Sequence, residues 1–323
     1  MIDLRLAGLN LLCCPNCAGS LRLELNAAGA SHWLLCNSCG RRFEIAADLP
    51  RFVAPDNYAA SFGFQWNRHA RTQLDSHTGV AISAERIAIA TGWPARLDGE
   101  VILEAGSGAG RFTEVLIRSG ATVLSFDYSS AVDANARNNG GAPNLLLFQG
   151  DIFAIPCPAK SLDRVFCLGV IQHTPDPARA FRSLASRVKP GGQLVVDVYA
   201  KSWLAVFHWR FLLRPFTKRM EKERLYRLLE RWVPPFIPLS AGLRRILGRA
   251  GARLLPIAEY SHLGFSPEVN RDWAILDTFD MLSPEFDQPQ SVATVRSWFE
   301  AEGFRNIEVF RGPNGVVARG VAP

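Results

Sequence analysis

Hydrophobic and polar positions alternate with two different periods along most of this chain. From Val101 onward, short apolar runs are separated by segments in which apolar residues recur every three to four positions. Such runs predict buried parallel strands, and the segments between them predict helices that cover both faces of the sheet. The predicted strands are Val101–Glu104, Thr122–Asp127, Asn144–Gln149, Arg164–Leu168 and Gln193–Tyr199, and the predicted helices are Phe112–Arg118, Ala131–Arg137 and Pro177–Arg187.

The pattern changes near the C-terminus. Val292–Ala301 has helical spacing and ends at Gly303, and two short strands follow at Asn306–Phe310 and Val316–Arg319. The glycine-bounded connection between these strands predicts a hairpin. The pattern therefore predicts an α/β fold with a Rossmann-like sheet of seven strands that ends in an antiparallel hairpin.

Three segments lie outside this alternation. Residues 1–55 are rich in turns and contain paired cysteines, whereas residues 56–95 are polar and aromatic and predict a helical lead-in or lid. Residues 96–323 form the α/β domain, which a helical stretch interrupts at about residues 200–290. We expect this insert to cap the domain and not to fold as a separate unit.

The composition indicates a folded chain, since 48% of the residues are hydrophobic and 20% are charged. We find no signal peptide and no apolar run near the ~20 residues that a membrane-spanning helix requires. We therefore expect a cytoplasmic protein, in which structural disulfides are rare. Cys157 and Cys167 stand alone in apolar surroundings and are expected to be inert buried thiols.

Two Cys-X-X-Cys pairs, Cys14/Cys17 and Cys36/Cys39, are separated by eighteen residues. Four thiolates at this spacing predict a tetrahedral Zn²⁺ site, which is structural because no coordination position remains open. Cys13 adjoins the first pair and is expected to be a bystander. The continuation over residues 41–53 resembles the Trm112-like zinc ribbons, so residues 1–55 are expected to form a zinc ribbon.

Three alternate glycines, Gly106, Gly108 and Gly110, follow the first predicted strand of the α/β domain. Glycines at a strand–helix turn let the backbone approach a ligand closely. A dinucleotide-binding motif would need its third glycine at the position of Arg111. The spacing instead resembles motif I of the class I S-adenosylmethionine-dependent methyltransferases.

Further matches to that family follow in order. Asp127 ends the second strand, where an acid can accept hydrogen bonds from both ribose hydroxyls. Asp151 follows the third strand, where the family contacts the adenine amino group, and Val188-Lys-Pro-Gly-Gly precedes the fifth. The resemblance covers about residues 96–199 and 290–320. The cofactor-binding residues that it implies are Glu104, Gly106, Gly108, Gly110, Asp127, Tyr128, Asp151, Ile152 and Leu168.

His173 follows the fourth strand, where this family meets its substrate, and is the candidate general base. Alternatively, His173 only braces the loop or the cofactor. Aromatic and polar segments before the first strand and at the end of the insert are expected to cover the two ligands. They make Gln65, Trp66, Trp273 and Asp277 candidate pocket residues, although core packing would equally explain each Trp and an exposed or capping role Asp277.

The insert is strongly basic, with thirteen Lys and Arg against three Glu over residues 201–253. Trp203, Phe207 and Phe211 recur every four positions among these cations. An amphipathic basic helix of this kind could be a lid with a solvated face, a peripheral membrane contact or an RNA contact.

The resemblance is to the UbiE/UbiG-like methyltransferases and implies transfer to a small-molecule or lipidic acceptor with an oxygen nucleophile. The alternative is an RNA methyltransferase in which the ribbon and the insert bind RNA. Against it, the sequence after the fourth strand lacks the Asn/Asp-Pro-Pro-aromatic motif of many amino-directed nucleic-acid enzymes. A third hypothesis is a cofactor-binding assembly protein without turnover.

Overall fold

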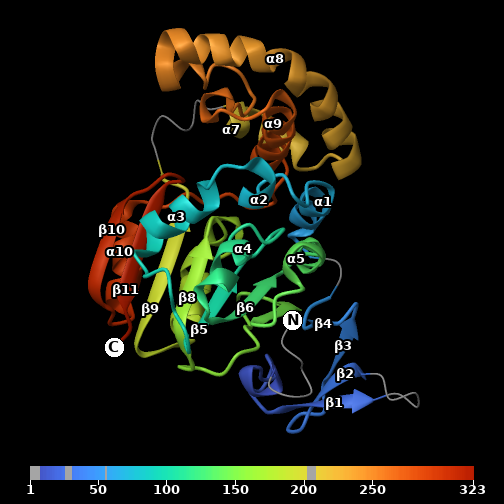
Figure 1. Ribbon diagram of the computed structural model, residues 1–323, viewed down its shortest axis with the longest axis vertical. Coiled ribbons are helices and arrows are strands. Elements are labelled where there is room, and N and C mark those ends of the chain that lie inside the picture. The colour runs from blue at the N-terminus through green and yellow to red at the C-terminus, as the bar shows by residue number, and fades with distance from the viewer. Residues whose placement is uncertain (1–7, 26–30, 55–56, 202–208) are drawn as a thin grey trace.

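The fold is organised around one twisted sheet. The computed structural model describes residues 8–25, 31–54, 57–201 and 209–323. Within these residues an eleven-stranded sheet has the order β1-β2-β3-β4-β7-β6-β5-β8-β9-β11-β10 (Figure 1). Its parallel centre comprises β5 (Val101–Ala105), β6 (Thr122–Asp127), β7 (Leu145–Gln149), β8 (Leu162–Leu168) and β9 (Val188–Val198).

The C-terminal hairpin is β10 (Arg305–Arg311) and β11 (Val316–Val321), and β11 inserts between β9 and β10, antiparallel to both. The seven strands from β7 to β10 thus have the Rossmann-like arrangement with a terminal antiparallel hairpin that the sequence predicts. The fold class is confirmed.

Alternate residues of the strands pack against helices on opposite faces. Ile102 and Val123 point to one face, together with α3 (Ile82–Thr91), α4 (Thr113–Leu116) and α5 (Ala131–Asn139). Leu103 and Leu124 point to the other face, with α6 (Pro177–Ala185) and α10 (Val292–Ala301). Because both faces are covered, apolar residues occupy consecutive positions in the central strands, and this explains why the sequence shows apolar runs and not strict alternation.

The ends of two of these helices are encoded locally. Asp176 caps α6 by accepting a hydrogen bond from the backbone N–H of Arg179 at 3.0 Å, and Pro177 occupies the first helical position. Ser291 caps α10 in the same way through the N–H of Thr294 at 3.0 Å.

The N-terminal ribbon is an antiparallel meander of β1 (Leu21–Leu25), β2 (Ser31–Cys36), β3 (Arg42–Ala46) and β4 (Leu49–Arg51). The turn between β3 and β4 is tight, with positive φ at Ala47 and Asp48. Strand β4 pairs in parallel with β7, with Arg51 opposite Gln149. The ribbon therefore extends the sheet of the α/β domain.

Helices close the other end of the molecule. The lead-in comprises α1 (Ala60–Arg68), α2 (Asp75–Thr78) and α3, and the cap comprises α7 (Trp209–Thr217), α8 (Lys222–Gly251) and α9 (Pro267–Leu282). Figure 1 shows α8 arching over α7 and α9, at the opposite end from the ribbon. Phe64 of α1 packs into the apolar core of the cap, which joins the two. Short 3₁₀ helices span Gly8–Leu11, Ile117–Ser119, Ile171–His173 and Ser261–Leu263.

The basic helix that the sequence predicts in the insert is described only in part. Trp203 and Phe207 lie outside the described residues, whereas Phe211 lies in α7. Among the described residues, no helix is long and apolar enough to cross a membrane.

Candidate functional site

The glycine loop after β5 is held in a conformation that only glycine adopts easily. Gly106, Gly108 and Gly110 all have positive φ, at 81°, 53° and 89°. A Cβ atom on Gly106 would lie 2.3 Å from the Val170 side chain, so the space is also closed. The loop is fixed to β6, because the N–H groups of Gly106 and Ser107 both donate to the carbonyl of Phe126, at 2.8 and 2.9 Å.

Glu104 lies beneath this loop. Its side chain is buried and accepts hydrogen bonds from the hydroxyls of Thr113 and Ser125, the latter at 2.8 Å. Burial raises the pKa of Glu104 to about 7. Glu104 therefore links β5 to β6 and α4 under the loop.

Asp127 meets the glycine loop from the end of β6. One carboxylate oxygen accepts bonds from the N–H and the hydroxyl of Ser129, at 2.8 and 2.7 Å, and the other accepts the N–H of Gly108 at 2.9 Å. Burial raises its pKa, whereas these hydrogen bonds lower it. A carboxylate has about four acceptor positions, so described groups already use three of those of Asp127.

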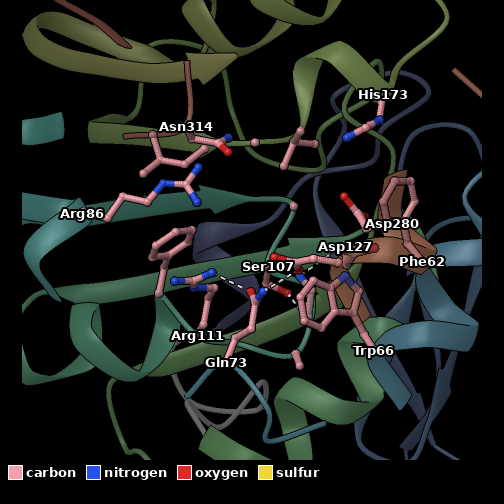
Figure 2. Close-up of a pocket in the computed structure, with 18 of the residues that line it drawn as sticks. Phe62, Trp66, Gln73, Arg86, Ser107, Arg111, Asp127, His173, Asp280 and Asn314 are labelled. Atoms are coloured by element: carbon pink, nitrogen blue, oxygen red, sulfur yellow. Dashed lines mark hydrogen bonds between the residues drawn. The ribbon is translucent and has the colours of Figure 1, made fainter. Parts of the chain in front are cut away.

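The loops at the carboxyl ends of the strands surround a cavity of about 690 Å³ (Figure 2). The glycine loop lines one side, and residues of α1 and α9 lie across it. Of the residues expected from the sequence, Gly106, Gly108, Asp127, Tyr128, Ile152, Leu168, His173, Trp66, Trp273 and Asp277 line the cavity. Glu104, Gly110, Asp151 and Gln65 are not among its lining residues.

Gly110 and Asp151 lie next to the cavity wall. A Cβ atom on Gly110 would lie 2.1 Å from the side-chain oxygen of Asn135, so this glycine permits close packing of the loop on α5. Asp151 accepts a hydrogen bond from the N–H of Phe153 at 2.8 Å, and burial raises its pKa. Both residues therefore shape the turns that carry the cavity wall.

His173 ends a 3₁₀ turn (Ile171–His173) after β8 and lines the cavity. Its Nδ1 lies 3.0 Å from the carbonyl oxygen of Phe286, and its ring packs between those of Phe62 and Tyr199. A carbonyl can only accept, so Nδ1 must carry a proton. In the neutral ring, the lone pair is then on Nε2.

Asp277 is the centre of a polar cluster in the cavity. It accepts hydrogen bonds from the hydroxyl of Tyr260, from Nε1 of Trp273 at 3.1 Å and from the amide of Gln73 at 3.0 Å. Burial raises the pKa of Asp277 to about 6. Asp277 lies within α9, and its hydrogen-bond partners are side chains, so it does not cap a helix.

A second carboxylate, Asp280, lies one turn further along α9 and also lines the cavity. It accepts hydrogen bonds from the amide of Gln65 at 3.0 Å and from the hydroxyl of Tyr199 at 3.2 Å. Gln65 thus acts on the cavity through Asp280. The side of the cavity formed by α9 is consequently lined by hydroxyl and carboxylate groups.

Two arginines in the wall were not expected from the sequence. Arg86 of α3 and Asn314 lie beside each other in the wall (Figure 2). Arg86 pairs with the buried carboxylate of Asp197 at 3.0 Å, and Asn314 donates to the same carboxylate at 3.0 Å. Arg111 follows the glycine loop and donates to the hydroxyl of Ser83 at 3.1 Å. Burial lowers the pKa of Arg111 to about 10. Nothing in the sequence around Arg86 distinguishes it from a solvated helix residue.

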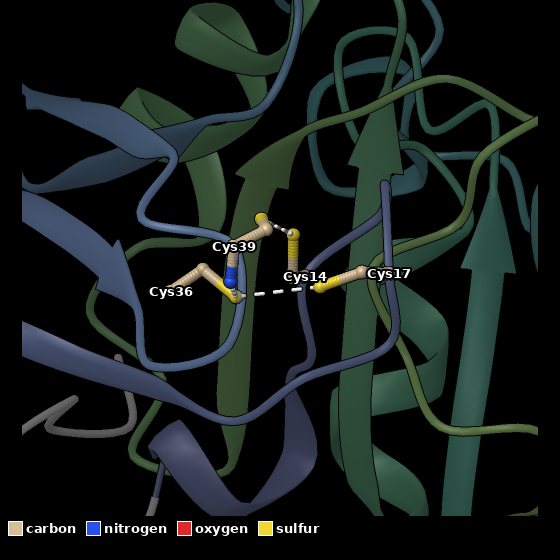
Figure 3. A group of neighbouring side chains, drawn as sticks. All are labelled: Cys14, Cys17, Cys36 and Cys39. Carbon is tan, nitrogen blue, oxygen red and sulfur yellow. Dashed lines mark hydrogen bonds between the residues drawn. The ribbon is translucent and has the colours of Figure 1, made fainter.

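The four cysteines of the two Cys-X-X-Cys pairs converge in the ribbon (Figure 3). Their sulfur atoms all lie within 4.8 Å of one another, with Cys14 and Cys39 at 3.7 Å and Cys17 and Cys36 at 3.5 Å. Zn–S bonds of about 2.3 Å in a tetrahedron require sulfur atoms about 3.8 Å apart. The donor set fits a structural metal.

Among the other thiols, Cys13 is buried and its backbone N–H donates to the carbonyl of Pro156 at 2.9 Å, outside the group of four. Cys157 and Cys167 are buried, and burial raises the pKa of each. They are the inert core thiols that the sequence predicts.

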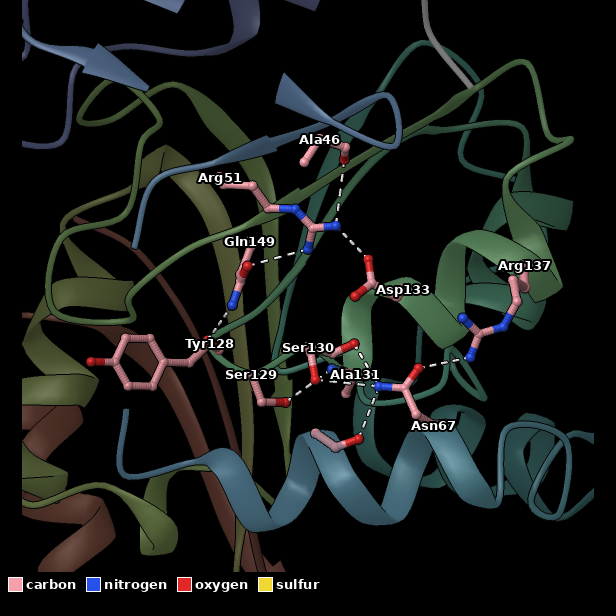
Figure 4. Close-up of polar contacts among 11 residues, drawn as sticks. Ala46, Arg51, Asn67, Tyr128, Ser129, Ser130, Ala131, Asp133, Arg137 and Gln149 are labelled. Atoms are coloured by element: carbon pink, nitrogen blue, oxygen red, sulfur yellow. Dashed lines mark hydrogen bonds and ion pairs between the residues drawn. The ribbon is translucent and has the colours of Figure 1, made fainter. Parts of the chain in front are cut away.

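Arg51 connects the ribbon to the wall of the cavity (Figure 4). Its guanidinium forms an ion pair with Asp133 of α5 and donates to the side-chain oxygen of Gln149 at 3.2 Å. Gln149 in turn donates to the carbonyl of Tyr128 at 3.0 Å. Tyr128 lines the cavity next to Asp127, so the ribbon is two hydrogen bonds away from that wall.

Residues 103–196 match the family model described as "Methyltransferase domain". The chain is similar to the ubiquinone biosynthesis O-methyltransferases of Coxiella burnetii and Pseudomonas aeruginosa. It is 30% identical to the first over 114 residues and 35% identical to the second over 107 residues. These stretches cover 35% and 32% of this chain, and 49% and 46% of the relatives. The chain thus spans about half the length of these relatives.

Solved structures with a similar course of the chain are more distant. One is the complex between the Haloferax volcanii Trm112 methyltransferase activator and a methyltransferase, with a TM-score of 0.45 and 15% identity over 84% of this chain and 100% of that chain. Another is an O-methyltransferase family 2 protein from Planctomyces limnophilus in complex with apigenin, also with a TM-score of 0.45 and 15% identity, over 84% of this chain and 63% of that chain.

Proposed function

We propose that this chain, which carries a class I S-adenosylmethionine-dependent methyltransferase domain, transfers a methyl group to an oxygen atom of a small-molecule acceptor inside the 690 Å³ cavity. The observation that carries the proposal is that the glycine loop, Asp127 and His173 line one cavity, at the carboxyl ends of the strands. Ligands of open α/β sheets bind at that edge.

We assign the cofactor to the side of the cavity formed by the glycine loop. The positive φ values there allow the backbone to approach a ligand, and Asp127, whose carboxylate lines the cavity, is the candidate partner of a ribose hydroxyl. Tyr128, Ile152 and Leu168, the other residues that we assign to the cofactor, also line the cavity. When bound, S-adenosylmethionine supplies a methyl group on a sulfonium that is already activated for attack.

Since the methyl donor is activated, this chain's residues chiefly align the acceptor and exclude water. Positioning of this kind can supply up to about 7–11 kcal/mol. The rings of Phe62 and Trp66 cover the cavity from α1, and α9 covers it from the cap. Nε2 of His173 carries the lone pair that would take the proton of an acceptor hydroxyl.

The size and walls of the cavity support a small acceptor over RNA. Cavities of about 300–1,000 Å³ are typical of small-molecule sites. Helices α1 and α9 both contribute to the wall of the cavity and contact each other, and Gln65 of α1 donates to Asp280 of α9 at 3.0 Å. This contact supports an enclosed site for a small compound.

We further propose that Cys14, Cys17, Cys36 and Cys39 hold a structural Zn²⁺, since four thiolates leave no open position for chemistry. The metal would stabilise the ribbon, and through β4 the edge of the sheet.

The test compares His173→Ala and His173→Gln with an exposed control, His77→Ala, in an assay of methyl transfer to a panel of phenols, catechols and enols, with total RNA as a further acceptor. We expect both His173 variants to lose about 10²–10⁴-fold in turnover, because removing a general base has this effect. Cofactor affinity, measured by calorimetry, should remain unchanged in all three variants.

Full turnover in His173→Ala would remove the general base from the proposal. Transfer to RNA, with none to the panel, would overturn the acceptor class. Cofactor binding without transfer to any acceptor would favour the assembly protein.

A further inference from the structure

The outer face of the cap exposes large apolar side chains. On α8, Leu228 is 43% exposed, Trp232 55%, Leu239 51% and Ile246 79%. These residues are separated by four, seven and seven positions, so at 3.6 residues per turn they share one face of the helix. Exposure of contiguous apolar side chains to water is unfavourable, so such a stripe indicates a surface that contacts another molecule.

Exposed arginines accompany this stripe. Arg224 lies four residues before Leu228 and Arg231 three residues after it, and both positions are neighbours of Leu228 on the helix surface. Arg227 and Arg245 are also exposed. We call this set of four apolar residues and four arginines the outer face of α8.

The acidic residues of α8 do not neutralise these arginines. The helix contains two glutamates, Glu223 and Glu230, and both pair with Arg68 of α1, at 3.4 and 3.5 Å. They therefore point toward the body of the protein and fix α8 on the lead-in helix. The outer face is left with apolar and positively charged groups.

An apolar groove of about 520 Å³ opens beside this face, between α7, α8 and residues 255–257. Leu228 and Trp232 belong both to its wall and to the exposed stripe, and Leu213 and Thr217 of α7 form the opposite side. The groove is lined almost entirely by hydrocarbon, so the apolar surface continues from the stripe into the cap.

We propose that the outer face of α8 docks this protein on the surface of an anionic lipid bilayer. Trp and Leu side chains suit the boundary between headgroups and acyl chains, and each arginine near an anionic leaflet adds about 1 kcal/mol of attraction. A second copy of the chain would bring arginines against arginines in a parallel pairing. An RNA would account for the arginines but not for Trp232, Leu239 and Ile246.

This proposal goes beyond methyl transfer, because docking of α8 on a bilayer does not depend on which acceptor the cavity binds. A helix in the plane of the membrane surface needs only one apolar face.

The test is cosedimentation of the full chain with vesicles of phosphatidylcholine alone and of phosphatidylcholine with phosphatidylglycerol, at low and high salt. The variants are Leu228→Ser/Trp232→Ser and Arg224→Gln/Arg231→Gln. The matched control is Ile89→Ser, an apolar residue of α3 that is 48% exposed outside the cap. Circular dichroism and cofactor affinity report on folding of each variant.

We expect binding to the anionic vesicles that weakens with salt, a loss of about tenfold or more in each double variant, and no change in Ile89→Ser. Equal binding by the Leu228/Trp232 variant and the unmodified chain would overturn the proposal. So would binding to RNA without binding to vesicles, or a dimer that the same variant converts to monomers. Vesicle binding by a chain that binds no cofactor would leave docking intact and refute the proposed function instead.

Discussion

Arg51 of the ribbon offers the sharpest test of how the two parts of the fold act on each other. The substitution Arg51→Met keeps the length of the side chain and removes its charge and donors. The Arg51 side chain is 14% exposed and that of Asp133 32%, so the pair lies between exposed pairs, worth about 0.2–1 kcal/mol, and buried pairs, where losing one partner costs about 3–5 kcal/mol. We expect a loss of about 1–2 kcal/mol in the free energy of unfolding.

The same change should weaken cofactor binding. Arg51 holds Gln149 and Asp133, and these residues hold Tyr128 and the start of α5 on either side of Asp127. Without that support, binding itself must order the loop, and the ordering free energy is subtracted from affinity. If most of this loss of about 1–2 kcal/mol is taken from the free energy of cofactor binding, the Kd for S-adenosylmethionine rises about five- to thirtyfold. Titration calorimetry measures this directly.

The control is Arg42→Met, on the neighbouring strand of the same ribbon. Arg42 pairs with Glu24 on the surface, with side-chain exposures of 60% and 35%. We expect no change in cofactor affinity and less than about 0.5 kcal/mol in stability. Both variants should retain the zinc content of the unmodified chain. If Arg51→Met binds the cofactor as tightly as Arg42→Met does, the ribbon does not support the cofactor loop.

Three further predictions concern the glycine loop, the acid beneath it and the ribbon. Gly106→Ala should lower stability by about 1–3 kcal/mol, measured by urea unfolding, because φ is +81° and the new Cβ atom meets Val170 at 2.3 Å. Burial raises the pKa of Glu104 to about 7 in the folded chain, so the stability that its protonated form contributes is complete below about pH 4.5 and is lost as the pH rises through 7. The stability of Glu104→Gln relative to that of the unmodified chain should therefore be greater at about pH 8 than at about pH 5. A difference in stability that does not change with pH would contradict this. Cys36→Ser should lower bound zinc, measured by mass spectrometry, from about one equivalent to less than half, and an unmodified chain purified without zinc would contradict the assignment.

The sheet could be predicted because local signals determine it. Each central strand is a short apolar run, and each covering helix has a 3.6-residue period, so type and order follow from the sequence. The glycine loop could be predicted for the same reason, since a backbone with closely spaced positive φ values requires glycines, and these are visible in the sequence as Gly106, Gly108 and Gly110. The spacing of the two Cys-X-X-Cys pairs likewise predicts that the four cysteines form one cluster.

Contacts between segments that are far apart in the sequence could not be predicted, because no local pattern of residues indicates them. The pairing of β4 with β7 depends on the path of the chain over nearly one hundred residues, and a three-residue strand carries too little pattern to indicate it. Arg86 and Asp280 reach the cavity from helices whose other residues look like ordinary surface or core. The sequence predicts Glu104 as a cofactor residue but does not indicate its partner Thr113, whose hydroxyl donates to the Glu104 carboxylate beneath the loop.

The central claim is that the glycine loop and Asp127 bind S-adenosylmethionine. Titration calorimetry of the cofactor into the full chain and into Asp127→Ala tests it most directly. We predict one site per chain and, because a hydrogen bond to a charged group contributes about 1.5–3 kcal/mol, an affinity about ten- to a hundredfold weaker in the variant. A folded chain that does not bind the cofactor, or an Asp127→Ala variant that binds it with unchanged affinity, would contradict the account.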